Sequence, residues 1–154
     1  MVNMNYAAII PYYTLTGANE TYCFLEDGTR VSYPYSSKRF ISRLFYSYHI
    51  DPVLRKHWAI QVLYMKHYLP LVLKSDMIFI PIKIRTHVPM HDGVLGYILV
   101  SSIKSYEDFK VTLTNNVIIE TLSSAAYISK KLREAHLLRH SYKELMQSYP
   151  YMKE

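Results

Sequence analysis

The sequence is poor in the residues that covalent cross-links and phosphate-binding loops need. It has one cysteine, Cys23, so no disulfide can form within the chain. It has four glycines, and none has the spacing of a P-loop or a dinucleotide-binding turn. No apolar run approaches the roughly 20 residues that span a bilayer, and the start lacks the basic-then-apolar profile of a signal peptide. We therefore expect a soluble, cytoplasmic protein that does not bind membranes.

Catalytic and metal-binding motifs are also missing. His87, His91 and Asp92 lie close together, but Pro89 prevents the helical spacing that paired histidine ligands normally use. No third ligand stands at a recognisable distance, and no nucleophile elbow is present. We expect no metal, no cofactor and no enzymatic activity.

Acidic residues are scarce in the middle third of the chain. Residues 38–87 hold nine Lys or Arg side chains but only two acids, Asp51 and Asp76. Their net charge is +7, whereas residues 1–37 carry −2 and residues 88–154 carry +1. Solvated faces usually mix the two signs. This concentration of positive charge is typical of a surface that binds a polyanion.

The overall composition is that of a folded domain. Half of the 154 residues are hydrophobic, which is enough for one domain with its own core. Sixteen are tyrosines, which suit a partly hydrated binding face or a subunit contact, although any one of them can equally pack at the edge of the core. We expect one domain over residues 1–146 and a flexible tail over residues 147–154.

Hydrophobic periodicity predicts an α+β fold, mainly antiparallel β-sheet, with a helix near residues 36–49 and another at the C-terminus. Turns are predicted at Asp27-Gly28 and at Asn115-Asn116, with Phe109 facing the same way as Val111 and Leu113. Residues 58–64, rich in β-branched and aromatic side chains, are predicted to form a strand.

The C-terminal helix is predicted to bury Ile128, Leu132 and Ala135. Its basic residues, Lys131 among them, are placed on the polar side.

Residues 78–88 alternate as a strand does, with Ile78, Ile80, Ile82 and Ile84 on one face. The other face begins with Phe79 and Pro81 and becomes basic. Since proline lacks the N–H that a central strand needs, we expect this segment at a sheet edge or a bulge.

Basic residues recur on several successive elements, so one surface can collect them. The cluster comprises Lys38, Arg39, Arg43, Arg55, Lys56, Lys66, His67, Lys83, Arg85 and His87. All of these except Lys38 form the predicted nucleic-acid site. Phosphate contacts of this kind give affinity and salt dependence but do not specify sequence.

Six segments of the sequence follow one another in an order that is shared with a known family. They are "KRF" at 38–40, "LRKHW" at 54–58, "KHYLPLVL" at 66–73, "DMIFIP" at 76–81, "VTLTNNVIIE" at 111–120 and "YISKKLREA" at 127–135. Together they resemble the competence transcription factor (ComK) family of Gram-positive bacteria, over residues 20–140. The order of the segments carries the resemblance, since no single one is diagnostic. Ile82, Lys83 and "GVLGYILV" depart from the family pattern, and Asn116 replaces the hairpin glycine.

The resemblance implies a transcriptional activator of DNA-uptake genes that recognises paired A/T-rich boxes in double-stranded DNA through the minor groove. It also implies self-association to a dimer or tetramer, contacts with RNA polymerase, and control by a proteolytic adaptor. The tail at 147–154 is then either the adaptor's docking segment or a frayed end.

A narrow A/T minor groove attracts basic side chains. Lys83, Arg85 and His87 would enter or straddle it, and Arg39, Arg55, Lys56 and Lys66 would hold phosphates. We expect Arg55, Lys56 and Arg85 to contribute most.

Two other functions stay open. A basic adaptor for an acidic protein would bind any polyanion without regard to sequence. A small nuclease would need a divalent metal, which the scarcity of acids in the basic third disfavours.

Overall fold

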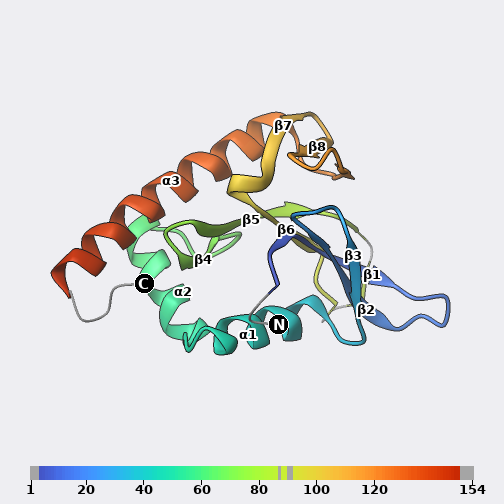
Figure 1. The fold of residues 1–154 in the computed structure, drawn as a ribbon, viewed down its shortest axis with the longest axis horizontal. Coiled ribbons are helices and arrows are strands. Elements are labelled where there is room, and N and C mark those ends of the chain that lie inside the picture. The colour runs from blue at the N-terminus through green and yellow to red at the C-terminus, as the bar shows by residue number, and fades with distance from the viewer. Residues whose placement is uncertain (1–3, 87, 90–91, 150–154) are drawn as a thin grey trace.

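A computed structural model describes residues 4–86, 88–89 and 92–149 (Figure 1). Strands β3-β2-β1-β6-β5-β4 form a six-stranded antiparallel sheet, and β7-β8-β9 form a three-stranded antiparallel sheet. The predicted α+β class is therefore confirmed. The elements, in chain order, are β1 (Tyr6–Tyr13), β2 (Asn19–Leu25), β3 (Arg30–Tyr33), α1 (Ser37–Ser47), α2 (Pro52–Leu63), β4 (Leu71–Lys74), β5 (Met77–Lys83), β6 (Leu95–Leu99), the 3₁₀ turn η1 (Val100–Ser102), β7 (Ile103–Glu107), β8 (Lys110–Leu113), β9 (Ile118–Glu120) and α3 (Ala125–Ser148).

The large sheet is covered differently on its two faces. Helix α1 packs on one face, where Phe40 and Leu44 meet Phe79 and Leu99. Helix α3 and the small sheet lie on the other face, as Figure 1 shows. Helix α2 joins the two sides at the β4 end of the sheet and contacts α3 through Trp58. No helix in the described part of the chain is both long and apolar enough to cross a membrane.

Capping explains the two adjacent helices. The Ser36 hydroxyl accepts a hydrogen bond from the Arg39 N–H at 3.2 Å, which starts α1 as predicted. The strand predicted at 58–64 is wrong, because that segment is the second half of α2. Asp51 caps α2 by accepting from two backbone N–H groups, at 2.9 and 3.3 Å, and Pro52 occupies the first helical position. These start signals outweigh the weak β-propensity of the residues that follow.

Strand β5 is not at a sheet edge, so that prediction is also wrong. It lies between β6 and β4, and it pairs with β6 without a bulge, Pro81 opposite Tyr97. Pro81 is tolerated because the β4 ladder stops at the Leu71–Phe79 pair and does not reach the proline. Residues 78–82 are buried whichever way they face, and only Lys83 is exposed.

The predicted turns are confirmed where the structure tests them. Gly28 has φ +90° in the β2–β3 turn, and Asn116 has φ +71° in the β8–β9 turn. Phe109 departs from its prediction, because it is exposed at a left-handed φ of +66° while Val111 is buried.

Helix α3 buries Ile128 and Ala135 as predicted. Lys131 also lies on that buried side, with 2% of its surface exposed, so its placement on the polar side is wrong. The helix continues to Ser148, and residues 150–154 of the predicted tail lie outside the described residues.

Candidate nucleic-acid interface

A cleft of about 780 Å³ opens on the α1 face of the large sheet, beside that helix. Its walls come from α1, α2, the segment that joins α2 to β4, and the loop before β6. Leu71 and Tyr97, which line the cleft, pack in the same hydrophobic cluster as α1. The cleft therefore exists because α1 covers only part of this sheet face.

Six basic residues from four segments of the chain line the cleft. They are Lys38, Arg55, Lys56, Lys66, His67 and Arg85. No Asp or Glu is among the described residues that line it. The structure thus brings together five of the nine sequence-predicted site residues, and it adds Lys38.

The other predicted residues lie elsewhere. Arg39 and Arg43 are exposed on α1, where their guanidinium carbons lie 5.8 and 4.7 Å from the centre of the Tyr35 ring. Lys83 is exposed at the end of β5 and does not line the cleft, although its strand partner Leu95 does. His87 lies outside the described residues, as does His91 of the histidine group considered for a metal. Among the described residues, no three His, Cys, Asp or Glu side chains gather as a metal site requires.

The two arginines of the cleft form hydrogen bonds with other parts of the protein. Arg55 Nη1 donates to the Val72 carbonyl at 2.7 Å, and its guanidinium lies 5.0 Å from the Tyr142 ring centre. This arginine therefore joins α2 to β4 and α3. It supplies fixed positive charge to the cleft wall in addition to this structural role.

Arg85 is held in a similar way. Its Nε donates to the Gly93 carbonyl at 2.8 Å, and its Nη2 donates to Asn19 Oδ1 at 2.7 Å. Asn19 in turn donates to Asp92 at 3.3 Å. The Arg85 Nη1 atom is buried and forms no hydrogen bond with a described residue. The two N–H groups of this atom therefore have no partner among the described residues.

The lysines of the cleft contrast with the arginines. Lys38, Lys56 and Lys66 have exposed side chains, and none forms an ion pair with a described carboxylate. Their ammonium groups stay available to an anion from solution.

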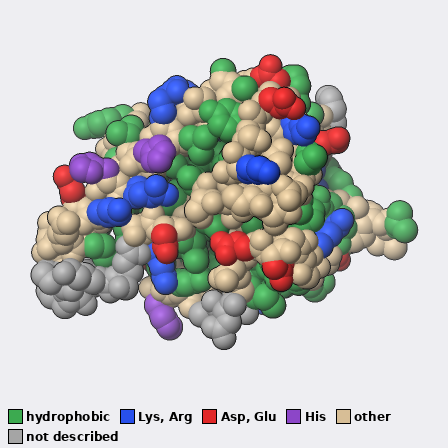
Figure 2. Space-filling model, turned by 45° about the horizontal axis from the view of Figure 1, so that its top comes forward, with side chains coloured by type: hydrophobic (Ala, Val, Ile, Leu, Met, Phe, Trp, Pro, Cys, Tyr) green, Lys and Arg blue, Asp and Glu red, His purple; other side chains and the backbone are tan. Residues whose placement is uncertain are grey.

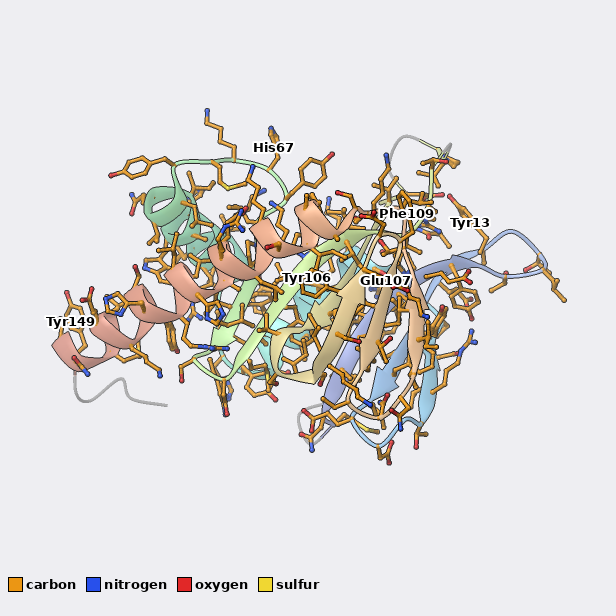
Figure 3. The ribbon with its side chains drawn as sticks, turned by 90° about the horizontal axis from the view of Figure 1, so that it is seen from above. Tyr13, His67, Tyr106, Glu107, Phe109 and Tyr149 are labelled. Carbon is orange, nitrogen blue, oxygen red and sulfur yellow. The ribbon has the colours of Figure 1, made fainter. Side chains whose placement is uncertain are left out.

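Residues 64–68, which we call the rim loop, carry Lys66 and His67 along one side of the cleft. Figure 3 shows His67 on this segment, pointing away from the body of the molecule. Tyr64 and Tyr68 lie at the two ends of the rim loop, and both have left-handed backbones, with φ +55° and +56°. The Tyr64 N–H still donates to the Ile60 carbonyl at 2.8 Å, which closes α2.

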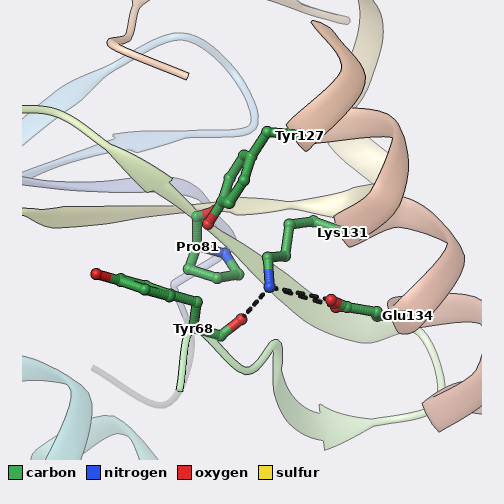
Figure 4. Close-up of polar contacts among 5 residues, drawn as sticks. All are labelled: Tyr68, Pro81, Tyr127, Lys131 and Glu134. Atoms are coloured by element: carbon green, nitrogen blue, oxygen red, sulfur yellow. Dashed lines mark hydrogen bonds and ion pairs between the residues drawn. The ribbon is translucent and has the colours of Figure 1, made fainter. Parts of the chain in front are cut away.

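A buried ion pair on α3 holds the rim loop (Figure 4). Lys131 Nζ donates to the Tyr68 carbonyl at 2.7 Å and lies 3.0 Å from Glu134 Oε1. Both residues are buried, at 2% and 6% exposure. Next to them, the Tyr127 hydroxyl donates to the Pro81 carbonyl at 3.0 Å, and burial raises the pKa of this phenol, which keeps it a donor.

The bonds of Lys131 to Glu134 and to the rim loop are not among the predictions from the sequence, although the sequence carries a signal for a buried pair. Positions 128, 131, 135, 138 and 142 recur at helical spacing, so Lys131 falls in the middle of the apolar stripe. A lysine there, with an acid three residues later, indicates a buried pair.

Comparison with known protein families, with curated proteins and with solved structures finds no match. Function has to be inferred from the site.

Proposed function

We propose that this protein is a DNA-binding transcriptional activator whose cleft docks the DNA backbone. The observation that carries the proposal is the convergence of six basic residues on one cleft that no carboxylate of the described residues lines. Like charges repel, and no carboxylate in the described part of the chain pairs with the three lysines. Such an arrangement is favourable when an anionic ligand supplies the missing charge, and the phosphates of DNA supply it repeatedly.

The preferred DNA in this proposal is an A/T-rich duplex. A narrow A/T minor groove concentrates negative potential, which favours a cluster of Lys, Arg and His side chains over a protein of mixed charge. Arg39 and Arg43 extend the basic surface along α1 beyond the cleft. We further propose paired A/T boxes bound by a dimer or tetramer, acting at the nucleoid on genes for DNA uptake. Contacts with RNA polymerase and a proteolytic adaptor belong to the same proposal.

A second candidate is a basic adaptor that binds an acidic protein segment. The apolar floor of the cleft, which includes Leu71, Leu95 and Tyr97, favours this alternative because it would accept the apolar side chains of such a segment.

Binding titrations at two salt concentrations distinguish the two functions. The probes are matched duplexes with either two spaced A/T tracts or G·C substitutions. We expect an A/T preference that persists at the higher salt, and a salt slope that falls by about 1 for each of Lys56→Ala and Lys66→Ala. Lys104→Ala, an exposed lysine of the small sheet, is the control and leaves the affinity unchanged.

Arg85→Ala should also weaken binding to the A/T duplex, because it removes positive charge from the cleft wall. Equal, steeply salt-dependent binding to both duplexes would favour the adaptor. No binding to either would reject the activator.

A further inference from the structure

The rim loop presents two aromatic rings to solvent beside two cations. Tyr64 is 94% exposed and Tyr68 is 54% exposed, and Lys66 and His67 stand between them. Large aromatic side chains gain free energy by burial, so two exposed rings so close together need a reason. Proteins that bind single strands combine these features, because unpaired bases stack on aromatic faces while nearby cations hold the backbone.

The exposure of these rings does not come from a loosely held loop. Tyr64 and Tyr68 adopt left-handed backbone conformations, which residues with a Cβ atom seldom adopt. Such conformations persist where surrounding contacts impose them, and they gather at functional sites. Tyr64 takes this conformation as the residue that closes α2. At Tyr68 the contact is the bond from buried Lys131 to the Tyr68 carbonyl, after which Leu69 and Pro70 are buried. In Figure 4 the Tyr68 ring points away from Lys131 and α3.

The cleft next to the rim loop has the dimensions of a small-ligand site. Its volume of about 780 Å³ lies in the range of pockets that enclose small molecules, whereas a duplex is far larger. Pro11, Leu95 and Tyr97 give it apolar surface for a base. The Tyr97 hydroxyl forms no hydrogen bond with another described residue, and burial raises its pKa to about 12, so it stays a donor.

We infer that the rim loop and the cleft bind an unpaired stretch of a DNA strand. Bases stack on Tyr64 and Tyr68, a neighbouring base enters the cleft against Tyr97, and the phosphates contact Lys56 and Lys66. This inference rests on the proposed DNA-binding function and deepens it. The unpaired strand comes from A/T-rich duplex that has opened. Exposing a base costs free energy mainly because its pairing and stacking are lost, so weakly paired A/T-rich sites open first.

The test is a fluorescence anisotropy titration with a labelled oligothymidylate of about 12 nucleotides, within the usual site size of a single-strand-binding module. We expect the Tyr64→Ala/Tyr68→Ala variant to bind it at least about 10-fold more weakly than the wild type, since each lost stacking contact weakens binding. Tyr64→Phe/Tyr68→Phe keeps the rings and should bind as the wild type does. Tyr46→Ala is the matched control, because Tyr46 is 61% exposed on α1 but does not line the cleft.

A second variant tests the contact between Lys131 and the rim loop. Lys131→Met/Glu134→Leu replaces the buried pair by apolar side chains, which keeps the helix packed. We expect unchanged circular dichroism and faster amide hydrogen exchange at residues 66–69. Oligothymidylate binding should also weaken, although the variant keeps Lys66. Unchanged exchange at these amides would overturn the role of Lys131.

The outcomes separate the inference from the function on which it rests. Wild-type binding to the A/T duplex without binding to oligothymidylate would overturn the inference and leave the activator standing. Binding to neither would overturn both. Equal affinity of the wild type and the double alanine variant for oligothymidylate would remove the stacking role. Displacement of the oligonucleotide by thymidine monophosphate at the same nucleotide concentration would assign the site to free nucleotides instead of a strand.

Discussion

The cleft and the small sheet both carry lysines, but their surroundings differ. On the small sheet, Lys110 lies 3.6 Å from Glu107, and Lys104 donates to Asn116 at 3.2 Å. Figure 2, which brings the α3 and small-sheet side forward, shows acidic and basic side chains interspersed over much of this face. At the cleft, six basic residues meet, and none of the described residues that line it is an Asp or Glu. The comparison teaches that the two regions differ less in their number of cations than in the described carboxylates near them, since the small sheet pairs a lysine with an acid and the cleft does not.

The two regions also differ in how their ion pairs are used. The Lys110–Glu107 pair is exposed, so solvent screens it. The Lys131–Glu134 pair is buried, and its lysine also bonds the Tyr68 carbonyl of the rim loop beside the cleft. Buried pairs carry a large desolvation cost, and fixing a conformation is the benefit that best accounts for keeping one here.

The largest expected effect is on DNA affinity when the charge of the cleft is reversed. Lys56→Glu/Lys66→Glu should weaken binding to an A/T-rich duplex by about 100-fold at low salt, because two phosphate contacts become repulsive. Lys104→Glu/Lys110→Glu makes the same change in net charge on the small sheet and should have less than about a tenth of that effect. Anisotropy titrations measure both variants, and equal losses would contradict the distinction between the regions.

The next effect is on stability. Lys131→Met leaves Glu134 buried without its partner, so the free energy of unfolding should fall by about 3–5 kcal/mol. Urea denaturation measures this loss. Lys131→Met/Glu134→Leu should recover most of it, since an apolar pair fills the same space. A single variant as stable as the wild type would show that the pair is not buried.

A smaller effect is expected at the start of α2, which positions Lys56. Asp51→Ala removes the helix cap and should lower the free energy of unfolding by about 1 kcal/mol. Asp76→Ala is the control, since it removes the other acid of the basic third from an exposed turn. Both variants raise the net charge by one, so both should bind DNA slightly more tightly, but only Asp51→Ala should lose stability in urea.

The smallest effect is expected at the exposed ion pair. Glu107→Gln removes the partner of Lys110, and the free energy of unfolding should change by less than about 1 kcal/mol. DNA affinity should stay within a factor of about two, because a charge this far from the cleft is screened. A loss as large as that of Lys131→Met would show that the small sheet contributes more than its exposure indicates.

Much of the fold could be predicted from the sequence because its signals are local. Gly28 and Asn116 mark their turns, and Ser36 marks the start of α1. Helix α2 differs from the strand predicted at 58–64 because Asp51 and Pro52, which mark the start of α2, outweigh the β-propensity of that segment. The edge position predicted for Pro81 was wrong because the length of β4 depends on tertiary structure, which no local pattern reveals.

The candidate site could be predicted in part. The excess of positive charge in residues 38–87 pointed to the residues that the cleft collects. The sequence does not show that Arg55 and Arg85 bind backbone carbonyls, since those partners lie on other elements. It also does not show the left-handed conformation of Tyr68 or the hydrogen bond that its carbonyl accepts from Lys131, a residue distant in the sequence.

The most direct test of the central claim is to map the DNA-contacting surface by NMR. An A/T-rich duplex is titrated into isotope-labelled protein, and the shifts of the backbone amides are followed. We predict that the largest changes occur at Lys38, Lys56, residues 64–68 and Tyr97, while residues 104–120 of the small sheet change little. Largest changes on the small sheet, with the cleft unaffected, would contradict the assignment of the cleft as the nucleic-acid interface.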